Sequence, residues 1–143
     1  MYMDVRIEFY PDYSQDMEKD SSKGPVRREL EDLKKLYPTV FAMVKTIFTN
    51  LENGESSIEE LVETEIFGKL SNTNGCTLWE FRIPPKGRSG VFRAYCSKDE
   101  EDAGGEKKLV ITIYSAEIKK NFKAKADPEK INQACQRYKT HHQ

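Results

Sequence analysis

The residues of this chain that are best suited to chemistry are arginines, lysines, tyrosines and one glutamate in its second half. Glu80 and Arg82 alternate with apolar residues in one short run, and Arg93 and Tyr95 do so in the next. Guanidinium and ammonium groups bind phosphate oxygens through charge-assisted hydrogen bonds. RNA carries its own nucleophile, so a protein can cleave it without a metal by orienting the 2′-hydroxyl and stabilising charge on the phosphorus. These residue types therefore favour phosphate chemistry on RNA.

Each charged residue has a candidate role in such a cleavage. Arg93 would grip the scissile phosphate, while Arg82 and either Lys119 or Lys120 would add positive charge and donate a proton to the leaving oxygen. Glu80 would be the base that takes the proton of the 2′-hydroxyl. The alternative is that Glu80 and Arg82 form only a surface pair and that the two lysines are a solvated strand end.

Two tyrosines and a basic turn are candidates for contacts with the rest of the RNA. Tyr95 or Tyr114 would stack on a base or assist proton transfer, and the alternative is that both rings are half-buried packing residues. Lys86 and Arg88 lie in the turn from Pro84 to Ser89, between two predicted strands, where their charges would bind the RNA backbone.

Other kinds of active site lack their usual groups. His141 and His142 are the only histidines and stand at the C-terminus, so a serine or cysteine nucleophile would lack a histidine base. No phosphate loop of the GxxxxGK[ST] type occurs. The acidic run from Asp99 to Asp102 is contiguous, whereas a calcium loop places its ligands at alternate positions, so we expect a mobile hairpin loop from Ser97 to Lys108. We therefore expect neither a metal nor another cofactor.

The cysteines and the apolar runs indicate the environment of the protein. Cys76, Cys96 and Cys135 are odd in number and lack CxxC spacing, so we expect reduced cysteines rather than a disulfide framework or a zinc site. No apolar run reaches about 18 residues, and the N-terminus lacks the basic-then-apolar pattern of a signal peptide. These features predict a cytoplasmic protein that makes no membrane contact.

Charge is distributed unevenly along the chain, although the net charge is only −1. Residues 1–78 hold 9 basic and 15 acidic side chains, whereas residues 79–143 hold 14 basic and 9 acidic ones. The positive half contains the candidate RNA-binding residues, which is where a polyanion would be held. The alternative is that charged residues, 33% of the chain, simply cover a solvated surface.

Alternating patterns predict the strands that carry these residues. Val5, Ile7 and Phe9 alternate with polar residues, which indicates an opening strand that ends at Pro11. Three later runs are rich in aromatic and β-branched residues and predict an antiparallel meander: Leu78–Ile83, Gly90–Cys96 and Leu109–Tyr114. If Arg82 lies on the same face as Arg93, the sheet presents a cationic, tyrosine-bearing surface.

Helical patterns precede and follow the meander. After a polar stretch from Asp12 to Lys23, which we expect to be a flexible loop, one helix begins at Pro25 and carries an apolar stripe to Leu36. The other predicted helices are a second from Pro38 to Asn53-Gly54, a short third from Ser57 to about Glu65, and a closing helix after Asp127-Pro128. Matched stripes would let the first two helices cover one face of the sheet.

The 143 residues suffice for one domain with a real core, and we expect residues 1–143 to form a single domain. The order of elements predicts an α+β fold. Its small antiparallel sheet would have about four strands, with two N-terminal helices packed on one face and a C-terminal helix.

Short motifs along nearly the whole chain resemble the RelE/HigB superfamily of bacterial toxin components, most closely its phage-derived, HigB-like branch. Their order and spacing, rather than any one motif, carry the resemblance. The motifs are Phe9-Tyr10, Gly24-Pro25-Val26, Leu30-x-x-Leu33, Lys69-Leu70, Leu78-Trp79-Glu80-Phe81-Arg82, Phe92-Arg93, Lys119-Lys120, and Asp127-Pro128 with Ala134 in a final helix.

The resemblance implies a RelE-like fold and a toxin of a type II toxin–antitoxin system. Such a toxin is a metal-independent mRNA endoribonuclease, usually acts on ribosome-bound messages and so inhibits translation, and is silenced by a co-encoded, commonly DNA-binding antitoxin. Carried over by position, Arg82, Arg93, Lys119 and Lys120 would be its functional basic residues.

The chain departs from the family pattern beside these positions. Ser115-Ala116-Glu117 stands where the family often has His-Gly-Phe, which removes an acid/base group and places a negative charge near the expected RNA site. The alternative function is therefore a non-catalytic member of the same fold that binds RNA, the ribosome or a protein. A third is a phage or prophage accessory protein that works only through protein contacts.

Overall fold

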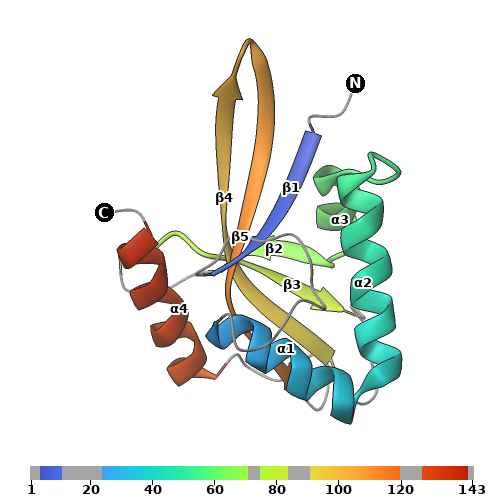
Figure 1. Cartoon of the computed structure of the whole chain (residues 1–143), viewed down its shortest axis with the longest axis vertical. Helices are drawn as coiled ribbons and strands as arrows, with labels where there is room; N and C mark the ends of the chain where they lie inside the picture. The colour runs from blue at the N-terminus through green and yellow to red at the C-terminus, as the bar shows by residue number, and fades with distance from the viewer. Residues whose placement is uncertain (1–3, 11–23, 71–74, 84–90, 120–126, 142–143) are drawn as a thin grey trace.

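A five-stranded mixed sheet forms the centre of the molecule, in the order β1-β5-β4-β3-β2 (Figure 1). The strands are β1 (Asp4–Phe9), β2 (Phe67–Lys69), β3 (Trp79–Ile83), β4 (Val91–Ala103) and β5 (Glu106–Lys119). The helices are α1 (Pro25–Leu36), α2 (Pro38–Glu52), α3 (Ile58–Glu63) and α4 (Pro128–His141). The α+β class predicted from the sequence is confirmed.

The computed structural model describes residues 4–10, 24–70, 75–83, 91–119 and 127–141. The predicted flexible loop from Asp12 to Lys23 lies outside these residues. So do the basic turn with Lys86 and Arg88, the second lysine of the candidate pair, Lys120, and the terminal His142.

The sheet differs from the prediction in strand number and in one pairing. It has five strands rather than four, because Phe67–Lys69, expected to be part of a connection, pairs with β3 as a short edge strand. Three residues with a central glycine are too few to show a period of two. The first strand pairs with β5 in parallel, Asp4 opposite Lys108 and Phe9 opposite Ile113, so the sheet is not purely antiparallel.

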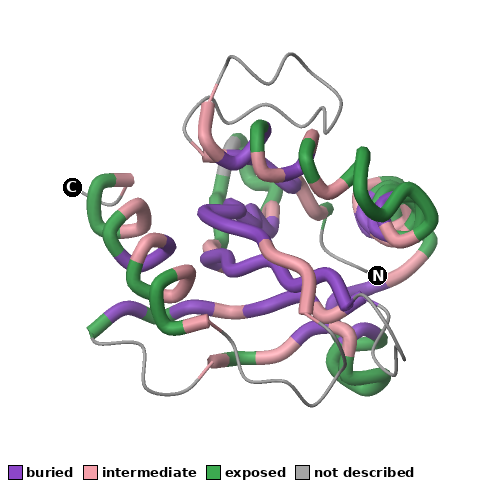
Figure 2. Tube along the Cα trace, turned by 90° about the horizontal axis from the view of Figure 1, so that it is seen from below, coloured by how far each residue is buried: buried purple, intermediate pink, exposed green. Residues whose placement is uncertain are grey.

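One face of the sheet is covered by α1 and α2, as expected from their apolar stripes, and also by α3. Figure 2 shows that the helices have buried inner sides and exposed outer sides. In α1 the stripe buries Val26 and Leu30, and in α2 it buries Phe41, Val44 and Phe48. Tyr37 separates the two helices because the residue before a proline avoids helical geometry, and its N–H closes α1 on the carbonyl of Leu33 at 2.8 Å. The predicted cap of α3 is also present, since Ser57 Oγ accepts from Glu60 N at 3.2 Å.

The C-terminal helix α4 packs on the opposite face and forms a second, smaller core (Figure 1). It begins as expected at Asp127-Pro128, where Asp127 Oδ1 accepts a hydrogen bond of 2.9 Å from the N–H of Glu129. The fully buried rings of this core are Tyr95 and Tyr114. The helix therefore lies directly on the face that carries the candidate site residues.

The stretch from Ser97 to Lys108 forms regular strand rather than the mobile loop expected from its composition. Both β4 and β5 continue through it and meet at Gly104-Gly105, with φ angles of 64° and 83°. Positive φ at both central residues gives a turn whose twist matches that of the strands, and glycine adopts it without strain. The sequence pattern failed here because both faces of the ribbon are polar near its tip, which removes the alternation.

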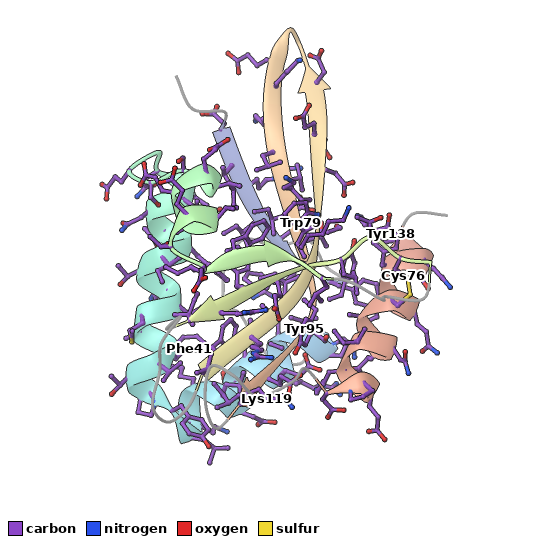
Figure 3. The ribbon with its side chains drawn as sticks, turned by 180° about the vertical axis from the view of Figure 1, so that it is seen from behind. Phe41, Cys76, Trp79, Tyr95, Lys119 and Tyr138 are labelled. Carbon is purple, nitrogen blue, oxygen red and sulfur yellow. A yellow bond between two sulfur atoms is a disulfide. The ribbon has the colours of Figure 1, made fainter. Side chains whose placement is uncertain are left out.

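The pairing of the cysteines differs from the expectation that all three are reduced. Cys76 and Cys135, 59 residues apart, form a disulfide with a Cα–Cα distance of 5.8 Å, and only Cys96 is a free, buried thiol (Figure 3). The expectation of reduced cysteines came from sequence spacing, which shows nothing about partners that meet only in the folded chain. The bridge joins α4 to the segment that leads into β3.

Candidate functional site

Cross-strand pairing places most of the predicted site residues on one face of the sheet. Arg82 of β3 lies directly opposite Arg93 of β4, and Glu80 lies opposite Tyr95. From β5, Glu117 lies opposite Arg93. The expectation that the two arginines share a face is therefore confirmed. We call this group the polar cluster, and its members are Glu80, Arg82, Arg93, Tyr95, Glu117 and Lys119.

Glu80 and Arg82 form an ion pair at the β3 side of the polar cluster. Nε and Nη2 of Arg82 each lie 2.5 Å from Oε1 of Glu80. The Arg82 side chain is 37% exposed, whereas that of Glu80 is 2% exposed. Within the part of the chain that the structure describes, the buried Oε2 of Glu80 accepts no hydrogen bond. A carboxylate oxygen buried in this way retains the capacity to accept a hydrogen bond.

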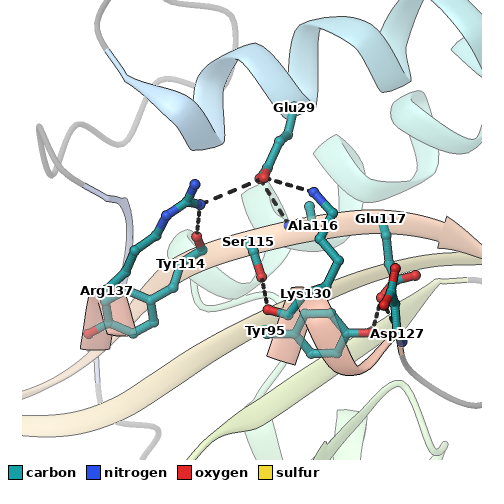
Figure 4. A network of polar contacts seen from close by, with 9 residues as sticks. All are labelled: Glu29, Tyr95, Tyr114, Ser115, Ala116, Glu117, Asp127, Lys130 and Arg137. Carbon is teal, nitrogen blue, oxygen red and sulfur yellow. Dashed lines mark hydrogen bonds and ion pairs between the residues drawn. The ribbon is translucent and has the colours of Figure 1, made fainter. Parts of the chain in front are cut away.

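Glu117 connects three other groups on the β5 side, and Figure 4 shows two of them, Tyr95 and Asp127. Its Oε2 accepts a 2.6 Å hydrogen bond from the Tyr95 hydroxyl and one of 3.2 Å from the N–H of Asp127. Its Oε1 lies 2.9 Å from Nζ of Lys119. Burial, and then the bond to Glu117, raise the pKa of Tyr95 above its ordinary range, so the phenol stays protonated and acts as a donor.

Arg93 is buried between the two ion pairs, with 3% of its surface exposed. Like charges at directly opposed positions of a sheet destabilise it, so Arg93 opposite Arg82 requires nearby anions. Glu117 supplies one carboxylate from the position directly opposite Arg93 on β5, and Glu80 supplies the other from the diagonal position on β3. Three cations and two anions leave the polar cluster with a net charge of about +1.

Another carboxylate, that of Glu29 on α1, holds α4 against the edge of β5 (Figure 4). Its Oε2 accepts from the N–H of Ala116 at 3.2 Å, and its Oε1 lies 3.0 Å from Nζ of Lys130 and 3.7 Å from Nη1 of Arg137. Arg137 also donates to the carbonyl of Tyr114. These contacts fix the helix that borders the polar cluster.

Tyr114 does not join the polar cluster. A register shift between Tyr95 and Cys96 leaves it outside the pairing of β4 and β5. Its hydroxyl lies 2.9 Å from Oγ of Ser97, and its ring packs under α4. Because Tyr95 and Tyr114 are both fully buried, neither ring offers a face on which a nucleotide base could stack.

The sequence alone did not indicate how Glu117 and Glu29 take part. In the sequence Glu117 is only a negative charge near the expected RNA site, and nothing in the pattern of α1 distinguishes Glu29 from the other charged residues of that helix. Both carboxylates act on groups far away in the chain, such as Tyr95 and Arg137, so no local signal could have revealed them.

Comparisons of this chain with protein-family models, with curated proteins and with solved structures found no match. Across the described residues, no three His, Cys, Asp or Glu side chains are grouped in a way that could hold a metal ion. The described helices also include none with the length and apolar character needed to cross a membrane.

Proposed function

We propose that this chain is the toxin component of a type II toxin–antitoxin system, a cytoplasmic mRNA endoribonuclease that acts at the ribosome and is silenced by a DNA-binding antitoxin. Its RNA site is the polar cluster. The observation that carries the proposal is the direct opposition of Arg82 and Arg93 on one sheet face, with the buried carboxylate of Glu80 beside them. The resemblance to the RelE/HigB superfamily points to the same residues.

The ion pair between Arg82 and Glu80 gives the first step of the mechanism. An arriving phosphodiester competes with Glu80 for the half-exposed guanidinium of Arg82. When Arg82 turns to the phosphate, its guanidinium leaves Oε1 of Glu80, and this oxygen becomes open to the 2′-hydroxyl. Substrate binding therefore uncovers the base, and the buried Arg93 adds positive charge beside it.

The RNA and the protein together supply every group that cleavage requires. Glu80 takes the proton of the 2′-hydroxyl, and the 2′-oxygen attacks the adjacent phosphorus in line with the leaving group. The bond from phosphorus to the 5′-oxygen breaks, and Lys119 donates a proton to that oxygen. The products are a 2′,3′-cyclic phosphate and a 5′-hydroxyl. The two arginines stabilise the charge that develops on the phosphorane.

The direct test uses purified protein and an RNA oligonucleotide, alone and with ribosomes. We expect cleavage with 2′,3′-cyclic phosphate ends, and none when the nucleotide at the cut site is 2′-deoxy. Arg82→Gln and Lys119→Gln should each lower the rate by about a hundredfold. Lys107→Gln, an equal charge change at the exposed end of β5, should leave it unchanged. Full activity in both cluster variants would overturn the proposed chemistry.

Induction in a bacterial host tests the cellular role. We expect growth arrest with the wild-type chain and relief by Arg82→Gln at equal protein level. Mapping of 5′ ends on messages should show new ends only with the wild type. Arrest that persists in Arg82→Gln would show that the polar cluster is not responsible.

A non-catalytic protein of the same fold is the second candidate, and a specific observation favours it. Lys119 is paired with Glu117 and Arg82 with Glu80, which lowers the charge available to a substrate. On this alternative the polar cluster binds RNA, the ribosome or a protein without cutting. RNA binding that is lost in Arg82→Gln, together with intact RNA ends, would identify it.

A further inference from the structure

The ribbon formed by the outer halves of β4 and β5 leaves one backbone edge open. β3 pairs with β4 only as far as Trp79 opposite Cys96, whereas β4 continues to Ala103. On the other side, β1 pairs with β5 from Lys108 to Ile113. Among the described residues, Ser97–Ala103 therefore has a strand neighbour on one side only (Figure 1). An open edge presents alternate N–H and C=O groups that can bind another strand.

The edge is open because the chain turns away just before β3. The pairing of β3 with β4 ends at Trp79 opposite Cys96, whereas Leu78 still pairs on the β2 side, where its carbonyl accepts a hydrogen bond of 2.9 Å from the N–H of Leu70. Two residues earlier, the disulfide from Cys76 to Cys135 fixes the segment to α4 (Figure 3). A longer β3 would have paired with Ser97–Ala103. Because β3 begins only at Trp79, this position is open to a strand of another chain.

The side chains along this edge favour one sign of charge in a strand that binds there. Asp99, Glu100, Glu101 and Asp102 are consecutive on β4, where Lys98 at the inner end is the one basic residue of the edge. The other nearby basic residues lie on the far side, in β5 and in β1. Lys107 and Lys108 face Asp102 and Glu101 across the ribbon, and Arg6 lies 3.3 Å from Glu101. A strand added at the open edge would lie next to the acids and one strand further from the lysines.

A second copy of this chain is a poor occupant of the edge. Pairing two β4 edges would place acids of one copy against acids of the other, and like charges on neighbouring strands repel. A basic strand at the same edge would instead be attracted by these acids. At the inner end, Lys98 lies over the ring of Trp79 with Nζ 3.9 Å from its centroid, so the acidic part of the edge is its outer part.

We propose that the Ser97–Ala103 edge of β4 binds an extended, lysine- or arginine-rich segment of a partner protein as an added antiparallel strand. The segment continues the line of β3, with its basic residues toward the tip of the ribbon. Backbone hydrogen bonds supply the binding energy, and the acids supply the selectivity. Binding of a strand at this edge requires no residue of the polar cluster, so it is independent of RNA cleavage.

The N-terminus offers a way to test the edge with a defined probe. Asp4 lies opposite Lys108, two strands from β4 and near the outer part of the ribbon. A lysine/valine/threonine strand of about eight residues, fused ahead of Met1 through a Gly/Ser linker of about 12 residues, would reach the edge. The linker raises the effective concentration of the probe to about the millimolar range, so weak binding becomes visible.

The readout is amide hydrogen exchange across the ribbon. We expect the outward amides between Ser97 and Ala103 to exchange about tenfold more slowly in the basic fusion than in the unfused chain. Two matched fusions are the controls, one with glutamates in place of the lysines and one with prolines at alternate positions. Neither should protect the edge, because one has the wrong charge and the other lacks the N–H groups.

Variants of the ribbon complete the test. Glu100→Gln with Asp102→Asn should remove most of the protection by the basic fusion, while exchange in the segment that pairs β1 with β5 stays unchanged and reports an intact fold. No protection by the basic fusion would overturn the proposal. Equal protection by the acidic fusion would also overturn the proposal. The acids would then serve only to prevent the edges of two copies from associating.

Discussion

The Tyr95 hydroxyl donates a 2.6 Å hydrogen bond to Oε2 of Glu117, and this contact joins β4, β5 and the start of α4 at one point. The same oxygen accepts from the N–H of Asp127, one residue before α4 begins, and the other oxygen holds Lys119. A residue that departs from the RelE/HigB pattern thus organises the cationic face and the helix that borders it. Its negative charge serves to position its neighbours as well as to lower the charge of the site.

Removing the Tyr95 hydroxyl tests how much this hydrogen bond contributes to the stability of the fold. Tyr95→Phe should lower the free energy of unfolding by about 1–2 kcal/mol, because a buried hydrogen bond to a carboxylate is lost. Urea denaturation measures the change. Tyr37→Phe, which alters an exposed ring, is the matched control and should have no measurable effect. Equal stabilities for wild type and Tyr95→Phe would show that the contact contributes nothing.

Neutralising Glu117 separates its charge from its hydrogen bonds. Glu117→Gln keeps an acceptor for Tyr95 but leaves Lys119 without its ion-pair partner, so the polar cluster gains one unit of net positive charge. If the polar cluster binds RNA, affinity at low salt should rise by roughly three- to tenfold. Fluorescence anisotropy with a labelled RNA, at two salt concentrations, measures it. Glu59→Gln makes the same charge change on the exposed side of α3 and should have no effect.

Reduction of the disulfide should destabilise the fold. Cys76 and Cys135 close a loop with a sequence separation of 59 residues, for which loop entropy predicts a loss of about 4 kcal/mol on opening. The unfolding midpoint with and without dithiothreitol measures the loss. In the double variant Cys76→Ser with Cys135→Ser, the reductant should have no further effect. Identical midpoints for the oxidised and reduced wild type would contradict the prediction.

Stability should depend on pH through Glu8. Burial raises the pKa of this carboxyl above its ordinary value of 4.5, although the charge of Arg6 acts against the shift. Between the unfolded and folded pKa the unfolded chain is the more ionised, so the contribution of Glu8 to stability falls as the pH rises from about 4. The advantage of Glu8→Gln over wild type in urea denaturation should therefore grow between pH 4 and pH 7. A constant difference would mean that Glu8 does not titrate differently on folding.

Local sequence signals determined the elements that position the site. Proline at the first helical position, the serine cap of α3 and the apolar stripes indicated the helices, because helix starts and buried faces depend on residues a few positions apart. Alternation in Trp79–Ile83 and in Val91–Cys96 likewise placed Arg82 and Arg93 on one face of each strand. The sequence therefore determined the α+β class and the main residues of the polar cluster.

Contacts between distant residues were decided only by the tertiary structure. The parallel pairing of β1 with β5, the disulfide from Cys76 to Cys135 and the bonds of Glu117 to Tyr95 all join positions that share no local pattern. The acidic ribbon shows the same limit, because its strands are held by backbone pairing and a two-glycine turn rather than by an apolar face. Local patterns fix what each segment forms, while packing decides which segments meet and which charges are neutralised.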